Sequence, residues 1–312
     1  MTKINMTNVG IKNIATSDFS TWTTTKLARV EQTLAQVLPE VNVRPHLLHE
    51  AMRYSALAGG KRVRALLCYA AAEMCDTNIL IADAAASAVE LIHAYSLVHD
   101  DMPCMDDDDL RRGKPSCHKQ YNDETALLVG DALQSLAFQV LSDSALGHHT
   151  NLQAPQQIHM LNILAKASGS TGMAGGQAID LASVGKPLAQ AELEAMHNLK
   201  TGALIQAAVL LGAISGNSTQ IAAVTSYAAN IGLAFQVVDD ILDVEADTAT
   251  LGKTAGKDAD SNKPTYVTIL GLIPAKQHAQ KLYEAAIAAI APFGESAQRL
   301  RELAAFIMQR SF

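Results

Sequence analysis

Aromatic residues are scarce in this sequence, and so is the alternation of apolar and polar residues that indicates strands. Phe, Trp and Tyr make up 4% of the 312 residues, whereas apolar residues as a whole make up 49%. Ala and Leu carry most of that apolar content, and both residues favour helices over strands. We therefore expect an all-α protein with enough apolar residues for a sizeable core.

Excess positive charge, closely spaced cysteine pairs and a signal peptide are also missing. The net charge is −7, from 24 basic and 31 acidic residues, which argues against a nucleic-acid partner. The four cysteines show no C-x-x-C spacing, so we expect free thiols in a reducing compartment rather than a zinc site. Residues 1–20 contain no apolar signal-peptide core. Together these features predict a cytoplasmic location.

No apolar run is long enough to predict a membrane span, for which about 20 residues are needed. The best segment, residues 203–214, is shorter and contains Gln206. We expect it to be a buried core helix.

Long segments with helical periodicity follow one another without a Pro/Gly/Ser-rich linker. The clearest cover about 82–99, 126–141, 199–211 and 222–242, and breaks are expected at Gly59-Gly60, Pro103, 113–115, 168–170 and 252–264. We expect a loosely ordered N-terminus over 1–20, followed by a single domain over 21–312.

Two acidic clusters stand at the ends of apolar helical segments. The first contains Asp100, Asp101 and Asp106, followed by three more aspartates at 107–109. The second contains Asp239, Asp240 and Asp243, which the spacings i,i+3 and i,i+4 place on one helix face, with Gln236 one turn earlier. Like charges at these spacings destabilise a helix unless a cation compensates them.

Oxygen ligands without a His or Cys pattern suit Mg²⁺, which shares its coordination with substrate phosphates. The alternative is a solvated acidic face, which we favour for residues 107–109 alone. An EF-hand is excluded because neither cluster has its spacing. We therefore predict a metal site built from both clusters.

Basic residues accompany the acidic clusters. A glycine pair precedes Lys61, Arg62 and Arg64, Arg111 and Arg112 follow the first cluster, and Lys253 and Lys257 follow the second. Carboxylates that hold Mg²⁺ and nearby cations are two ways to neutralise a diphosphate. His93 lies seven residues before Asp100 on nearly the same stripe, and Lys200 and Thr201 begin another apolar helix, where a buried lysine needs an anionic partner. Gln177 and Asp180 add polar groups to a helix of small residues.

From about Leu27 onward the sequence resembles the trans-isoprenyl diphosphate synthases, in particular their bacterial farnesyl diphosphate synthase branch. GGKRVR, DDMPCMD, LRRG, GMAGGQAIDL, KTGALI, FQVVDDILD and LGKTAGKD occur in the order of that family. The resemblance implies a helical bundle around a central catalytic cavity. It also implies a homodimer that joins isopentenyl diphosphate to an allylic diphosphate, with up to three Mg²⁺ ions per site or Mn²⁺ in their place.

The resemblance also implies a role for each motif residue. Asp100, Asp101 and Asp106 would bind two ions, and Asp239, with Asp240 and Asp243 nearby, a third. Arg111, Lys200 and Lys253 would hold the allylic diphosphate, whereas Lys61, Arg64, His93 and Arg112 would hold isopentenyl diphosphate. Thr201 and Gln236 would offer oxygens to the developing allylic cation. Tyr95, five residues before Asp100, resembles the position that limits chain length, and Ser96 lies on the same face as Asp100.

We expect a fifteen-carbon product, farnesyl diphosphate. The alternatives are a geranylgeranyl diphosphate synthase, a class I terpene cyclase, a non-catalytic partner subunit or an acidic interaction module. A cyclase has no need for the second diphosphate site that GGKRVR predicts. A non-catalytic subunit typically lacks one aspartate motif, whereas both are present here.

Overall fold

The computed structural model describes residues 18–143, 150, 152–186, 188–245 and 265–309, and nearly all of its regular structure is helical. The one sheet in this part of the chain is a short antiparallel pair, in which Leu110 is opposite Pro115. The elements are α1 (Phe19–Val37), α2 (His46–Ala56), α3 (Val63–Met74), α4 (Ile79–Asp100), β1 (Leu110–Arg111), β2 (Lys114–Pro115), α5 (Cys117–Gln120), α6 (Asp123–Ser142), α8 (Ala154–Ser168), α9 (Met173–Ser183), α10 (Gln190–His197), the π-helical turn η1 (Asn198–Gly202), α11 (Ala203–Gly212), α12 (Ser218–Glu245), α15 (Tyr266–Leu270), α16 (Leu272–Ile290), the 3₁₀ segment η2 (Ala291–Ala297) and α17 (Gln298–Gln309).

Side-chain caps fix the starts of several helices. Asp18, Asn78 and Asn122 each accept a backbone N–H from the first turn of the helix that follows, at 2.7, 2.9 and 2.7 Å. Such caps satisfy donors that have no partner within the helix. The all-α prediction is confirmed, and the four predicted apolar segments correspond to α4, α6, η1 with α11, and α12. The predicted boundary between an N-terminus and a domain stays a prediction, because residues 1–17 lie outside the described part.

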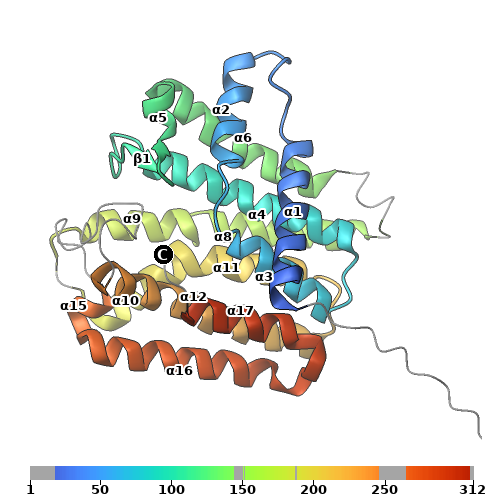
Figure 1. Cartoon of the computed structure of the whole chain (residues 1–312), viewed down its shortest axis with the longest axis vertical. Helices are drawn as coiled ribbons and strands as arrows, with labels where there is room; N and C mark the ends of the chain where they lie inside the picture. The colour runs from blue at the N-terminus through green and yellow to red at the C-terminus, as the bar shows by residue number, and fades with distance from the viewer. Residues whose placement is uncertain (1–17, 144–149, 151, 187, 246–264, 310–312) are drawn as a thin grey trace, which may run out of the picture.

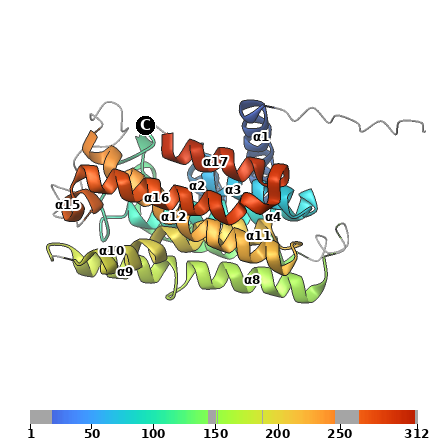
Figure 2. The same ribbon diagram turned by 90° about the horizontal axis from the view of Figure 1, so that it is seen from below.

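The helices pack in layers around α4, α11 and α12 (Figures 1 and 2). α4 lies along α6 and α3, α11 packs against α3, α4, α8 and α12, and α12 lies along α16. Figure 2 shows α8 and α9 on one face and α17 on the opposite face. Most of the core is one apolar cluster, and a second cluster joins α10, α12, α15 and α16. One end of α4 therefore lies between several helices, where a cavity forms.

Three helices are long and apolar enough to cross a membrane: α4, α6 and α12. This finding differs from the sequence-based expectation, because polar residues interrupt the apolar runs while the mean hydropathy stays high. In the most apolar 18-residue stretch of each helix, the bundle buries 72% of the residues in α4, 39% in α6 and 50% in α12. Packing within the protein thus accounts for most of the apolar surface of α4.

Candidate active site

A cavity of about 540 Å³ opens at the C-terminal end of α4. Its walls come from α4, α6, α9, η1 and the start of α3. Seven of the predicted site residues line it: Arg64, His93, Tyr95, Ser96, Asp100, Lys200 and Thr201. Met105, Met173, Ala174, Ala178 and Leu181 make other parts of the wall apolar. The cavity therefore combines a charged part with an apolar part.

The loop after α4 folds back and brings the first acidic cluster together. The backbone N–H of Asp106 donates to the carbonyl of Asp100 at 2.9 Å, which returns the chain to the helix end. Burial raises the pKa of Asp100 to about 6, and the neighbouring carboxylates of Asp106 and Asp101 add to the rise, while Lys200 and Arg111 oppose it. Crowded carboxylates of this kind are relieved when a cation binds between them.

Asp101 points to a different partner from Asp100. It is buried and accepts the Arg111 Nε–H at 3.0 Å, and Arg111 also approaches Asp108 at 3.5 Å. Burial raises the pKa of Asp101, and the Arg111 guanidinium opposes that rise. Asp101 lies with Arg111 and Arg112 around a second, much smaller void rather than in the main cavity wall. Of these aspartates, Asp100 lines the main cavity, so it is better placed than Asp101 to meet a ligand there.

The second acidic cluster connects to the cavity through two polar side chains. The Thr201 hydroxyl donates to Gln236 Oε1 at 3.1 Å, and Gln236 Nε2 donates to Asp239 at 3.3 Å. Asp240 and Asp243 are buried, and Asp240 accepts the backbone N–H of Tyr266 at 2.7 Å. Asp239 is therefore the member of this cluster that the hydrogen bonds link to the cavity.

No group of three His, Cys, Asp or Glu side chains in the described ranges gathers closely enough to enclose a metal ion alone. Mg²⁺ commonly keeps waters and substrate phosphates as ligands, so it needs few protein oxygens. The donor set at Asp100 and Asp106 consists of carboxylate oxygens and fits that ion.

Lys200 has the anionic partner that the sequence requires. Its Nζ lies 2.5 Å from Asp180 Oδ2, an acid of α9, and its charge also lowers the pKa of Asp100. Lys200 is in the π-helical turn η1, which packs tightly on α9. A Cβ on Gly176 would lie 2.1 Å from the Lys200 backbone N. Glycine at 176 thus permits the approach that places Lys200 between Asp180 and Asp100.

Arginines converge beside His93. Arg64 lines the cavity with His93, and Arg112 donates to the carbonyl of Gly59. Burial lowers the pKa of His93 well below its usual range, and Arg64, Arg112, Arg62 and Arg111 lower it further in that order. Gly60 has φ +117°, and a Cβ there would lie 2.7 Å from Arg112 Cζ. A neutral His93 thus stands among cations that suit a diphosphate.

Two other predicted cations differ in their setting. Lys61 is exposed, whereas Lys253 lies outside the described residues.

The polyprenyl synthetase family model matches residues 45–302. The chain belongs to the polyprenyl synthetase family. It is 48% identical over 269 residues to the farnesyl diphosphate synthase of Haemophilus influenzae, covering 84% of this chain and 88% of that protein. It is also 46% identical over 268 residues to the chloroplastic geranylgeranyl pyrophosphate synthase of Capsicum annuum, covering 85% and 71%. The structure of the Helicobacter pylori geranyltransferase complexed with magnesium and isoprenyl diphosphate matches with a TM-score of 0.79 at 30% identity, covering 94% of this chain and 97% of that chain.

In this polyprenyl synthetase, Tyr95 of α4 forms part of the cavity wall. Its side chain is buried, and its ring meets the ring of His99 edge-on, with centroids 5.8 Å apart. Burial raises the pKa of Tyr95, and a hydrogen bond with Gln134 of α6 opposes that rise. A Cβ on Gly130 would lie 1.9 Å from His99 Nε2, so α6 approaches closely here. Tyr95 therefore has a defined place in the wall.

Sequence reasoning missed His99, Gly130, Asp131 and Gln134 as cavity residues. Asp131 and Gln134 are i,i+3 on α6, and a polar stripe at that spacing within an apolar helix is the signal that could have indicated them.

Proposed function

We propose that this protein condenses isopentenyl diphosphate with dimethylallyl diphosphate and then with geranyl diphosphate, giving farnesyl diphosphate and diphosphate. The carrying observation is one cavity whose lining combines the charged side chains of Asp100, Lys200 and Arg64 with Tyr95 and several apolar side chains. That arrangement suits a substrate with a diphosphate head and a hydrocarbon tail.

Asp100 and Asp106, with Asp101, would hold two Mg²⁺ ions, and Asp239, with Asp240 and Asp243 nearby, a third. Mg²⁺, when bound, neutralises the charge that builds up on the departing diphosphate. Three ions per site, and Mn²⁺ as a substitute, are part of this proposal.

The protein's own side chains bind both substrates and orient them. Lys200, Arg111 and Lys253 hold the allylic diphosphate, while Lys61, Arg64, Arg112 and neutral His93 hold isopentenyl diphosphate. The Thr201 and Gln236 oxygens face the positive charge that develops on the allylic carbon. The isopentenyl C4 bonds to the allylic C1 as the bond from C1 to the diphosphate oxygen breaks, and a proton passes from C2 to the released diphosphate. The apolar wall excludes water, which would otherwise capture the cation.

The test is an assay of the purified protein with Mg²⁺, labelled isopentenyl diphosphate and dimethylallyl diphosphate. We expect a fifteen-carbon product and loss of turnover in EDTA. A twenty-carbon product would favour the geranylgeranyl alternative, which the 46% identity to the Capsicum enzyme supports. A cyclic hydrocarbon would favour a terpene cyclase, and no turnover would favour a non-catalytic subunit.

We also propose that the protein is a cytoplasmic homodimer without a nucleic-acid partner or a membrane span. Exposed apolar side chains, including Leu128 of α6 at 53% and Ile158 of α8 at 65%, support a dimer because a partner subunit would cover apolar surface. Sedimentation and cell fractionation test both points: a monomer, or recovery with membranes, would contradict them.

A further inference from the structure

Arg62, the middle cation of GGKRVR, does not face the cavity. Its side chain is 2% exposed and has three partners from three helices. Nε pairs with Glu31 of α1 at 2.8 Å, Nη1 pairs with Glu90 of α4 at 3.1 Å, and Nη2 donates to the Ala56 carbonyl of α2 at 2.6 Å. Arg62 therefore joins α1, α2 and α4 at the point where α3 begins.

Glu90 has a second partner in the same place. Its Oε1 accepts the backbone N–H of Ala65, the third residue of α3, at 3.1 Å. The residue before α3 is Arg62, which forms no side-chain cap of its own. Glu90 therefore supplies, from a neighbouring helix, the cap that α3 lacks. A carboxylate at this position also complements the positive end of the helix dipole.

The backbone at Arg62 is held in an unusual conformation. Its φ is 44°, in the left-handed region that arginine rarely adopts, so the surroundings must maintain it. This turn sets the direction from which the chain enters α3. Lys61 immediately precedes the turn, and Arg64, in the first turn of α3, lines the cavity. The placement of both cations thus depends on the Arg62 backbone.

We propose that Arg62 and Glu90 are positioning residues that hold Lys61 and Arg64 in place for the diphosphate of isopentenyl diphosphate. This inference rests on the function proposed above. A buried ion pair contributes little net stability compared with apolar packing, so its value here lies in fixing one geometry. Preformed cation geometry lowers the cost of ordering the site when the anion binds.

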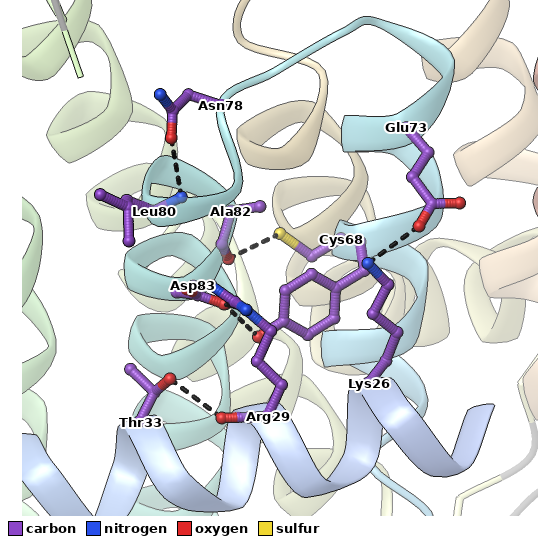
Figure 3. Close-up of polar contacts among 10 residues, drawn as sticks. Lys26, Arg29, Thr33, Cys68, Glu73, Asn78, Leu80, Ala82 and Asp83 are labelled. Carbon is purple, nitrogen blue, oxygen red and sulfur yellow. Dashed lines mark hydrogen bonds and ion pairs between the residues drawn. The ribbon is translucent and has the colours of Figure 1, made fainter. Parts of the chain in front are cut away.

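The chain offers a matched control in a second charged pair between α1 and α4, shown in Figure 3. Asp83 lies on α4 seven residues before Glu90, two turns away. It accepts two hydrogen bonds of 2.6 Å from Arg29 of α1 and one of 2.8 Å from the Tyr69 hydroxyl. Asp83 does not line the site cavity. Loss of its charge tests the link between α1 and α4 without touching the start of α3.

The experiment compares Glu90→Gln with Asp83→Asn, both of which replace a carboxylate by an amide of similar shape. For Glu90→Gln we expect the KM for isopentenyl diphosphate to rise about tenfold, the effect of weakening one charge-assisted hydrogen bond. The KM for dimethylallyl diphosphate and kcat should stay within about twofold of the wild-type values. This pattern distinguishes weaker binding of one substrate from a loss of transition-state stabilisation. Asp83→Asn should leave all three constants unchanged, and thermal denaturation reports the stability of each variant.

Arg62→Lys is the second variant. Lysine keeps the positive charge, but its single ammonium group cannot bond all three partners as the planar guanidinium group does. It should raise the same KM, whether or not Glu90→Gln folds. An unchanged KM in a folded variant, equal rises for both substrates, or the same rise in Asp83→Asn would overturn the positioning role. Wild-type protein without any turnover of the two substrates would instead reject the proposed function, together with this inference.

Discussion

At the scale of single residues, Asp100 is the carboxylate on which the charges of the site converge. Lys200, Arg111 and two other aspartates all act on its pKa. We predict that Asp100→Ala and Asp239→Ala each lower kcat by about 10²-fold or more, because each removes a group that stabilises transition-state charge. Initial rates at saturating substrate and Mg²⁺ measure this effect.

The control for these variants is Asp107→Ala. Asp107 belongs to the same acidic run, but its side chain is 60% exposed, and its ion-pair partners within the described residues are His118 and Lys119, each at 3.8 Å. We expect it to keep nearly full turnover. Near-normal kcat in Asp100→Ala would remove Asp100 from the metal site.

The two proposed diphosphate sites predict different effects on the two substrates. Arg64→Ala should raise the KM for isopentenyl diphosphate more than that for the allylic substrate, because Arg64 stands beside His93. Lys253→Ala should act mainly on the allylic KM. Steady-state kinetics with each substrate varied in turn measures the difference, and equal effects on both substrates would contradict the division.

His93 predicts a pH dependence of stability. Its pKa is lowered in the folded protein, so between that value and the unfolded value of about 6.5 the unfolded chain binds more protons. Stability should therefore fall as pH decreases through this window, by at most about 1.4 kcal/mol per pH unit from this residue. Urea unfolding of wild type and His93→Gln from pH 7 to 5 should show a shallower slope in the variant. Parallel slopes would show that other groups cause the acid sensitivity.

At the scale of elements, the contact between η1 and α9 places Lys200. We predict that Gly176→Ala destabilises the fold by about 2 kcal/mol or more and lowers kcat, because the new methyl would overlap the Lys200 backbone. Gly202→Ala is the control, since the nearest atom to its added Cβ is Asn198 Oδ1 at 3.4 Å. Urea unfolding and kcat of both variants provide the measurements. Similar losses in the two variants would show that helical glycine itself, rather than the close approach, is required.

Local pattern predicted the helices well, because apolar periodicity and caps are encoded over short stretches. The four segments predicted from periodicity are all helical, and the glycine pair and Pro103 mark real breaks. The same reasoning treated Arg62 as one of three phosphate-binding candidates. Its burial depends on Glu90, which lies 28 residues further along the chain, and no local signal indicates that contact.

The π-helical turn at 198–202 illustrates the same limit. Asn198, Thr201 and Gly202 are weak helix formers, but this composition does not indicate a π-helical turn or its contact with α9. Likewise, the spacing of Asp239, Asp240 and Asp243 predicts a shared face but not that Asp240 accepts the N–H of Tyr266. Residues that the sequence pattern places on one helix face therefore have different partners in the folded protein.

At the scale of the whole molecule, the cavity lies among α3, α4, α6, α9 and η1. The charged part lies where α4 ends at Asp100, and α6 contributes Gly130 and Gln134. Because Asp100 and Tyr95 both line this cavity, we predict that a hydrocarbon tail whose diphosphate lies at Asp100 extends along α4 toward Tyr95. At 1.5 Å per residue, Tyr95 lies roughly 7.5 Å along the helix axis from Asp100.

Tyr95 is therefore predicted to limit the product to fifteen carbons. His99 and Gln134 hold its ring in the wall, so a longer tail meets a fixed obstacle rather than a mobile side chain. Tyr95→Ala should open the cavity and shift the product to twenty carbons or more, with the Mg²⁺ requirement intact. Tyr95→Phe keeps the ring without the hydroxyl and should still stop at fifteen. Chromatography of dephosphorylated products decides between these outcomes: a twenty-carbon product from wild type, or a fifteen-carbon product from Tyr95→Ala, would show that the tail ends against another part of the wall.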